Sequence, residues 1–202
     1  MIHPDTELRY IDPAIGVGVF ATRLIPKGTI VWALDNLDQL LDPARVDQLD
    51  ELRRPLVLKY AYRDQEGRYV LCWDDGRFVN HSFHANCLGT AWDIEIAVRD
   101  ILPGEELCDD YGTLNLDEPM ECRPEPGIER TQALPDDLLR YAEEWDRQVL
   151  DAFRYYDSVA QPLAGLIRAE FHDRVRAAAE RGVLLDSIAA IYYPRSGDQG
   201  HD

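Results

Sequence analysis

The chain has 202 residues, of which 46% are hydrophobic and 29% are charged. These proportions are those of an ordinary globular protein, so they exclude a disordered or fibrous chain. The length allows one substantial core, or one compact domain with a smaller helical extension. The formal net charge of −17 argues against direct nucleic-acid binding, which needs a basic surface to neutralise phosphates. An acidic surface would instead attract a basic partner, although solubility alone also accounts for it.

The sequence carries no signal for a membrane or for secretion. Its longest apolar runs are only a few residues, far short of the roughly 20 that cross a bilayer. The first residues include neither a basic leader nor an apolar stretch, so we expect no membrane attachment and a cytoplasmic location. The four cysteines are widely spaced, which predicts reduced thiols rather than disulfides or a zinc motif: Cys72, Cys87, Cys108 and Cys122.

The first half of the chain predicts a mainly β fold of short strands. Four segments are rich in β-branched and aromatic residues and are bounded by Gly, Pro or Asp: Val17 to Phe20, Ile30 to Ala33, Tyr69 to Trp73 and Ile94 to Val98. Residues 35–59 predict short helical turns inserted between strands. Residues 21–28 and 97–104 share Ala, Arg, Ile and Gly at identical spacing, which predicts two similar strand-turn-strand units with a glycine of positive φ in each turn.

The second half predicts a linker and then helices. Residues 115–135 include four prolines and show no period, which is typical of a loop. After Pro135, apolar residues recur at helical spacing through Leu138 and Tyr156, with Asp136 placed to cap the first turn. A second helix is predicted from Pro162 to Arg181, with Gly182 as its stop.

Domain boundaries follow from these changes of pattern. A short third helical element is predicted at residues 184–192, and residues 196–202 predict a frayed tail. We therefore expect a β domain at 5–115, a linker at 116–134, a helical extension at 135–193 and a disordered tail at 194–202.

Three motifs carry the chemistry. They are Gly16-Val17-Gly18-Val19-Phe20-Ala21, then Arg77-Phe78-Val79-Asn80-His81-Ser82 with Asn86 following, then Glu105 to Gly112 with Asp110-Tyr111 inside it. Each motif alone is typical of a tight turn or a polar loop. In this order and at this separation they resemble the signature of SET-domain lysine methyltransferases, over about half of the chain. The resemblance implies a mainly β fold, the SET-domain β-clip with a knot-like threading, here with an α-helical C-terminal extension.

The resemblance also implies a cofactor, S-adenosyl-L-methionine, and a site for it. Glycines without a Cβ let backbone groups approach a ligand closely. In the family this backbone meets the methionine part of the cofactor, and the Arg-Phe and Asn-His positions contact the rest of it. The corresponding residues of this chain are Ile15, Gly16, Val17, Gly18, Arg77, Phe78, Asn80, His81 and Tyr111.

Tyrosines are the predicted catalytic residues. The resemblance places Tyr111 beside the transferring methyl group, where its hydroxyl can hydrogen-bond while its ring walls an apolar channel. A second tyrosine commonly lines the lysine channel in this family, upstream of the Asn-His-Ser segment. Tyr60 and Tyr62 both lie in the matching stretch, and the sequence does not choose between them.

The match has one gap. Many family members bind zinc through a cysteine that directly follows Asn-His-Ser and a cysteine cluster after the domain. Here Phe83 takes the first position and only Cys122 remains of the cluster, so we expect no zinc. One hypothesis is that Trp145, Phe153, Tyr155 and Tyr156 of the helical extension cover the lysine channel instead, and the alternative is that these residues only pack the helices.

Three functions follow as hypotheses. The first is transfer of a methyl group from the cofactor to a lysine of a basic protein substrate. The second is a non-catalytic SET-like module that binds a protein segment, and the third is an unrelated acidic interaction protein. Intact Asn80, His81 and Tyr111 favour the first. The substrate protein, the number of methyl groups added and the oligomeric state are not predicted.

Overall fold

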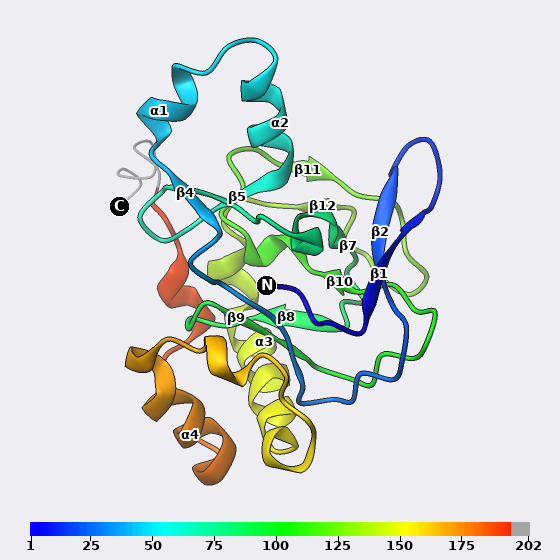
Figure 1. The fold of residues 1–202 in the computed structure, drawn as a ribbon, viewed down its shortest axis with the longest axis vertical. Coiled ribbons are helices and arrows are strands. Elements are labelled where there is room, and N and C mark those ends of the chain that lie inside the picture. Colours follow the sequence, from blue (N-terminus) through cyan, green and yellow to red (C-terminus); the bar gives the residue numbers. More distant parts are fainter. Residues whose placement is uncertain (195–202) are drawn as a thin grey trace.

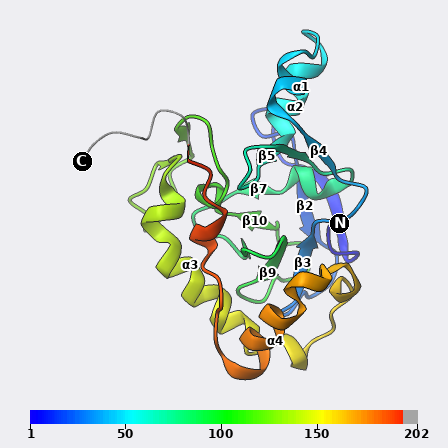
Figure 2. The same cartoon turned by 90° about the vertical axis from the view of Figure 1, so that its left-hand side faces the viewer.

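The computed structural model describes residues 1–194 of the chain. Its strands are short and belong to small sheets, and most of the helical residues follow residue 136 (Figures 1 and 2). The strands are β1 (Thr6–Tyr10), β2 (Val17–Ala21), β3 (Ile30–Ala33), β4 (Gln39–Leu41), β5 (Ala61–Arg63), β6 (Tyr69–Leu71), β7 (Asn80–His81), β8 (Cys87–Gly89), β9 (Ile94–Ala97), β10 (Cys108–Asp109), β11 (Met120–Glu121) and β12 (Gln132–Ala133). The helices are α1 (Pro43–Asp47), α2 (Arg53–Tyr60), α3 (Asp137–Phe153) and α4 (His172–Arg181).

All four predicted strands are present. The strand at Ile30–Ala33 has the predicted bounds, and the other three begin at the predicted residue and end within two residues of the predicted end. Strand β1 was not predicted, because four of its five side chains are exposed and it is held by its antiparallel pairing with β2. The helical prediction for residues 35–59 is wrong at β4, which pairs with β6, and right at α1 and α2.

The two segments of similar sequence, residues 21–28 and 97–104, lie side by side and are related by an approximate two-fold symmetry. Ile25 and Ile101 exchange main-chain hydrogen bonds of 2.9 and 3.0 Å. Gly28 donates its N–H to Ala97, and Gly104 donates its N–H to Ala21. The two glycine bonds are exchanged when 76 is added to the residue numbers of the first segment and subtracted from those of the second. Both glycines have φ near +90°, as the spacing predicted, because only glycine adopts that conformation without strain.

The helical extension packs on the three-stranded sheet β3-β9-β8. One core cluster joins buried side chains of this sheet, such as Ile96, to Trp145 and Phe153 of α3. Trp92 packs against Phe153 with ring centroids 5.4 Å apart. Burial of each such large side chain contributes about 1.5–3 kcal/mol. Figure 2 shows α3 running along one side of the sheet, so the extension completes the core of the β domain.

The ends of the predicted helices differ in detail. Asp136 precedes α3 but makes no side-chain cap, and its carboxylate accepts from Arg140 instead. The helix predicted from residue 162 begins only at His172, because Arg168 adopts extended backbone angles and pairs with Asp93 at 2.7 Å. Gly182 ends α4 in the left-handed conformation, as predicted.

The last part of the chain adds a short element. Residues 188–191 form a single 3₁₀ turn within the stretch predicted as helical. The predicted tail at 196–202 lies outside the described residues. Within residues 1–194, no helix combines the length and the apolar character that a bilayer crossing requires.

Candidate functional site

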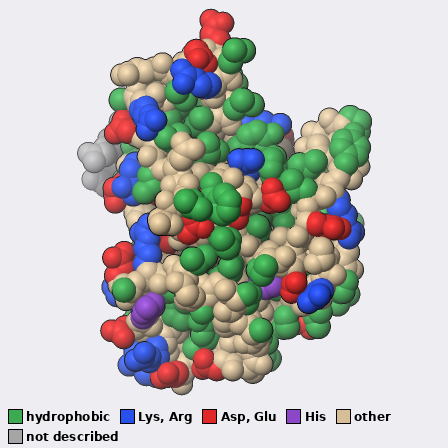
Figure 3. Space-filling view, viewed as in Figure 1, with side chains coloured by type: hydrophobic (Ala, Val, Ile, Leu, Met, Phe, Trp, Pro, Cys, Tyr) green, Lys and Arg blue, Asp and Glu red, His purple; other side chains and the backbone are tan. Residues whose placement is uncertain are grey.

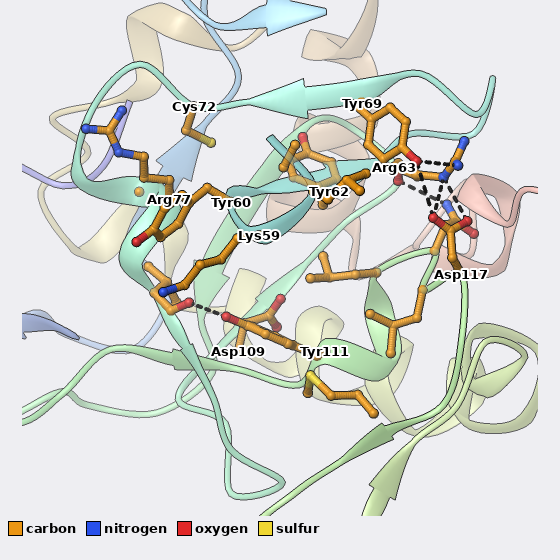
Figure 4. A pocket seen from close by; sticks show the side chains of 18 of the residues that line it. Lys59, Tyr60, Tyr62, Arg63, Tyr69, Cys72, Arg77, Asp109, Tyr111 and Asp117 are labelled. Carbon is orange, nitrogen blue, oxygen red and sulfur yellow. Dashed lines mark hydrogen bonds and ion pairs between the residues drawn. The ribbon is translucent and has the colours of Figure 1, made fainter. Parts of the chain in front are cut away.

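A cavity of about 400 Å³ opens beside Tyr111, and its wall includes five aromatic side chains together with aliphatic, charged and polar ones (Figure 4). Its lining comes from β3, the end of α2 with β5, β6, residues 76–79, β9, β10, the 3₁₀ turn at residues 111–113, and residues 114–120. The lining residues used below are Trp32, Tyr60, Tyr62, Arg63, Tyr69, Arg77, Val79, Glu95, Asp109, Tyr111, Leu114, Leu116, Asp117 and Met120. Segments that are far apart in the sequence therefore meet at one concave site, as expected for a binding pocket.

Tyr111 is held rigidly at the wall of this cavity. Its hydroxyl donates a 2.7 Å hydrogen bond to the Val79 carbonyl, and its main-chain N–H donates to Nδ1 of His81 at 3.1 Å. The carboxylate of Asp110 accepts from the Gly112 N–H and so shapes the turn that carries the tyrosine. Burial raises the pKa of Tyr111 well above its usual value. The side chain is therefore a neutral phenol at physiological pH.

The Asn-His strand is threaded beside the strand that precedes Tyr111. Strand β7 pairs with β10 in parallel, with Asn80 opposite Cys108 and His81 opposite Asp109. Asn86, which is 1% exposed, fastens this arrangement: its Nδ2 donates to the Glu106 carbonyl and its Oδ1 accepts from the Cys108 N–H. These bonds join the second and third sequence motifs into one unit.

Asn80 joins the first motif to the other two. Its Nδ2 donates to the Val17 carbonyl at 3.1 Å and to Oε1 of Glu106 at 2.7 Å. A Cβ on Gly18 would lie 2.3 Å from that Glu106 oxygen and 2.9 Å from Asn80 Nδ2. Glycine is thus required at position 18 by close approach of the other two motifs.

Gly16 is required for a different reason. It has φ of +92°, and no atom lies within 4 Å of the place where a Cβ would stand. The turn around it is closed by Asp12, whose carboxylate accepts from the N–H of Ile15. A hydrogen bond from Arg123, supported by main-chain N–H groups, lowers the pKa of Asp12 to about 2. The backbone of Ile15 and Gly16 is therefore fixed beside open space that a ligand can enter.

His81 presents an unused donor. Because Nδ1 accepts from Tyr111, a neutral ring carries its proton on Nε2, and Nε2 is buried with no hydrogen-bond partner in the described part of the chain. Burial lowers the pKa of His81, so the ring stays neutral. A buried N–H without a partner costs stability, which indicates a position where a ligand supplies the acceptor.

Arg77 and Phe78 lie between the Asn-His strand and α2. Phe78 contacts the ring of Tyr60 edge to face, with centroids 5.4 Å apart. Both residues also line a second, mostly apolar cavity of about 440 Å³ under α1 and α2, the helices that project at the top of Figure 1. The structure therefore brings every predicted cofactor residue into one region around Asn80, with Arg77 and Phe78 at its α2 side.

The two candidate channel tyrosines both line the cavity of Tyr111. Tyr62 contacts Trp32 edge to face at 6.1 Å, and burial raises its pKa well above the usual value. Tyr60 also lines the second cavity. Figure 4 shows the two side chains above Tyr111 from neighbouring positions of the chain. The choice that the sequence left open therefore stays open, because both can contact a guest.

Of the four carboxyl groups that line the cavity, two are not exposed, and the sequence predicted neither of them as a site residue. Asp109 precedes the motif tyrosine by two residues, and Glu95 lies in the middle of β9. The sequence feature that could have indicated Asp109 as a site residue is its position inside the third motif, next to Asp110. For Glu95 the signal was misleading, because the alternation in residues 93–98 indicated a side chain facing solvent, whereas the structure turns it to the cavity.

The cover of the cavity comes from residues 114–120 and not from the helices. Leu114, Leu116 and Met120 belong to the lining, whereas Trp145, Phe153 and Tyr156 pack in or against the core under the sheet and Tyr155 is exposed. The hypothesis that these helical aromatics cover the channel is therefore wrong. Packing of the helical extension accounts for Trp145, Phe153 and Tyr156.

The segment after Tyr111 is attached to the Asn-His-Ser segment through Glu125 and Arg130. The Glu125 carboxylate accepts from the Ser82 hydroxyl and from the N–H groups of Phe83 and His84. The Arg130 guanidinium lies 4.4 Å from the ring centroid of Phe83. Among residues 1–194, no group of three or more His, Cys, Asp or Glu side chains is arranged to hold a metal ion.

Arg130 links this segment to α3 as well. It pairs with Asp110 at 2.6 Å and with Asp137 at 2.7 Å, and it lies 4.3 Å from the ring centroid of Tyr141. Both carboxylates are almost fully buried. A guanidinium that pairs with two buried carboxylates and stacks on two rings uses the geometry specific to arginine. It therefore connects the helical extension to the turn that carries Tyr111.

Comparison with known families agrees with this geometry. The family model described as "SET domain" matches residues 16–112, which include all three motifs. Residues 16–112, which make up just under half of the chain, are therefore a SET domain.

Comparisons with individual proteins add little. A solved structure from Plasmodium falciparum, described as a candidate histone methyltransferase, is 18% identical. The match covers 55% of this chain and 95% of that one, with a TM-score of 0.41. No curated protein matches the sequence. The family assignment thus rests on the SET model and the motifs.

Proposed function

We propose that the protein transfers a methyl group from S-adenosyl-L-methionine to a lysine side chain of a basic protein. The observation that carries the proposal is the position of Tyr111, which lies with four other aromatic residues in the wall of a cavity and is hydrogen-bonded to the Asn-His strand. One residue therefore connects the region of the predicted cofactor residues with a cavity suited to an alkyl amine.

The cofactor region fits such a ligand in two respects. The backbone at Gly16 faces open space, and His81 offers a buried donor without a partner in the described part of the chain. The bound cofactor would supply an activated methyl group on sulfonium. The residues of this chain would bind it through the backbone at Ile15 to Gly18 and through the segment from Arg77 to His81.

The cavity supports a lysine guest. Transfer between an amine and a sulfonium methyl is an in-line displacement, in which alignment and exclusion of water supply much of the acceleration. Aromatic walls from Tyr60, Tyr62 and Tyr111 can contact the alkyl stem of a lysine. Burial also disfavours the charged ammonium and so favours the amine that reacts.

The partner proposal rests on charge. The net charge of −17 would speed encounter with a basic protein at low salt. On the face shown in Figure 3, acidic and basic side chains are interspersed and hydrophobic side chains gather near the middle. Lysine-rich proteins are therefore the first substrates to test.

Two measurements test the proposed function. Isothermal titration with S-adenosyl-L-methionine should show one site, and mass spectrometry of a lysine-containing peptide library should show mass increases of one methyl group on lysine. Matched peptides with arginine in place of lysine are the control. Cofactor binding without any transfer would favour the non-catalytic module, and absence of cofactor binding would contradict the proposal.

A further inference from the structure

Four carboxyl groups line the Tyr111 cavity, and the two that are not exposed, Glu95 and Asp109, have no cationic partner in the described part of the chain. Asp109 is 3% exposed; its Oδ2 accepts from the Thr113 hydroxyl at 3.1 Å, and its Oδ1 is buried with no partner. The Glu95 carboxylate takes part in none of the hydrogen bonds or ion pairs within residues 1–194. Figure 4 shows Asp109 beside Tyr111 at the base of the view.

Four cations line or approach the cavity, and none of them pairs with Glu95 or Asp109. Lys59 Nζ lies 5.0 Å from the centroid of the Tyr60 ring, and the Arg77 guanidinium lies 5.0 Å from that of Phe78. Arg63 pairs with Asp117 at 2.9 Å and donates to the Tyr69 hydroxyl. The amino group of Met1 attracts Glu95 from a distance, but it donates to the Ala33 carbonyl and lies 3.4 Å from Asp35. The two carboxyl groups therefore share a cavity in which no described side chain neutralises them.

Such an arrangement is unfavourable for the empty protein. Removal of a carboxylate from water costs several kcal/mol unless a partner compensates. Burial raises the pKa of Glu95 to about 7, and burial together with the charge of Glu95 raises the pKa of Asp109 well above its usual value. The pair therefore retains a proton near neutral pH or ionises when a cation enters.

Building on the proposed function, we propose that Glu95 and Asp109 receive the ammonium group of the substrate lysine and accept the proton that it must lose. One N–H proton passes from lysine Nζ to a carboxylate oxygen. The lysine becomes a neutral amine that keeps its lone pair, and the carboxylate becomes a neutral acid. The proton returns to solvent when the product leaves.

Other groups of the site are poorly placed for this step. The Tyr111 hydroxyl donates to Val79, and its raised pKa keeps it protonated. The His81 Nδ1 is occupied as an acceptor, and its Nε2 carries the proton. A carboxylate whose pKa lies near 7 is a stronger base than an ordinary one, so it is better matched to an amine whose pKa burial has lowered.

The test compares wild-type protein with Glu95→Gln, Asp109→Asn and the double variant. The amide of each variant has nearly the same shape as the carboxyl group, and the amide oxygen introduced by Asp109→Asn can still accept from Thr113. Glu143→Gln, on the exposed face of α3, is the matched control. Single-turnover methyl transfer is measured with the lysine peptide that binds most tightly from a mixed-sequence library. Thermal unfolding and cofactor binding are measured alongside.

A positioned proton acceptor typically contributes about 10²–10⁴-fold. We expect the double variant to lose at least about 10²-fold in transfer at pH 7 and each single variant at least about tenfold, because the other carboxyl group remains. Cofactor affinity should stay within twofold of wild type. The melting temperature should stay equal or rise, because an uncompensated charge is removed. Transfer within twofold of wild type in the double variant would overturn the proposal.

A binding readout separates this inference from the proposed function. Wild-type protein should prefer the lysine peptide to the same peptide with norleucine in place of lysine, and the double variant should lose that preference. An unchanged preference in the double variant would contradict the role of the two carboxyl groups. Failure of wild-type protein to transfer methyl to any lysine would count against the proposed function, and the peptide preference would still decide the inference.

Discussion

The side-chain amide of Asn80 donates a 3.1 Å hydrogen bond to the main-chain carbonyl of Val17. The same Nδ2 donates to Glu106, so one amide joins three segments that are more than 20 residues apart in the sequence. The space around this amide admits no side chain at Gly18. The shape of the predicted cofactor region thus depends on the contact between Asn80 and Val17, which neither the first nor the second motif reveals by itself.

The first prediction compares Gly18→Ala with Gly16→Ala. At position 18 the new methyl would meet Glu106 and Asn80 at less than 3.0 Å and separate the three motifs. We expect at least a tenfold loss of cofactor affinity by titration and a lower melting temperature. At position 16 a Cβ has room, so the only cost of alanine is the positive φ. This should lower the free energy of unfolding by about 1–2 kcal/mol and the melting temperature by a few degrees. Equal cofactor affinity in wild type and Gly18→Ala would contradict the proposed site.

The second prediction concerns the arginine that connects the helical extension to the Tyr111 turn. Arg130→Met leaves the nearly buried carboxylates of Asp110 and Asp137 without their partner, which costs about 3–5 kcal/mol in comparable pairs. Arg130→Lys should recover only part of this, because lysine cannot pair with both carboxylates and stack on Phe83 and Tyr141. Urea unfolding measures the difference. Arg147→Met on the exposed face of α3 is the control, and equal losses in the two methionine variants would contradict the role of Arg130.

The third prediction is a pH dependence of stability. Glu95 has a raised pKa in the folded protein, so the folded state binds its proton more tightly than the unfolded state does. Its contribution to stability is therefore fully present below about pH 4.3, the value for an unfolded glutamate, and is lost as the pH rises through about 7. Glu95→Gln should remove this loss.

The measurement is thermal unfolding of both proteins from pH 4.5 to 8. The melting temperature of wild type should fall relative to that of Glu95→Gln by about 2–4 °C for each kcal/mol lost. Groups that do not interact with Glu95, such as His81 with its lowered pKa, contribute equally to the two proteins. Asp109 interacts with Glu95, so its titration is part of the measured difference. Parallel melting curves across the whole range would show that Glu95 titrates normally.

Local patterns in the sequence were enough to predict much of this fold. The strand at Ile30–Ala33, the positive φ of Gly28 and Gly104, and the end of α4 at Gly182 all depend on nearby residues alone. Strands β1 and β4 were missed because their exposed or mixed side chains carry no period and their hydrogen-bond partners are distant.

The candidate site divides in the same way. The motif residues were found because they are close in sequence to one another. The carboxyl group of Glu95 was not found from the sequence, because the cavity that it lines forms only when β9 pairs with β3 and Tyr62 packs on Trp32. The attachment of residues 116–134 through Glu125 and Arg130 also depends on the tertiary fold, which the absence of a cysteine cluster could not reveal.

Methyl transfer by Tyr111→Phe decides whether this tyrosine takes part in the proposed chemistry. The variant keeps the ring but loses the hydroxyl that bonds to Val79, so stability should fall by about 1 kcal/mol and cofactor affinity should change little. The rate of transfer to a lysine peptide at saturating cofactor should fall by about 10²-fold or more, by analogy with loss of a positioned hydrogen-bonding group. A rate within twofold of wild type would contradict the proposed function of the site, because Tyr111 would then have no part in the reaction.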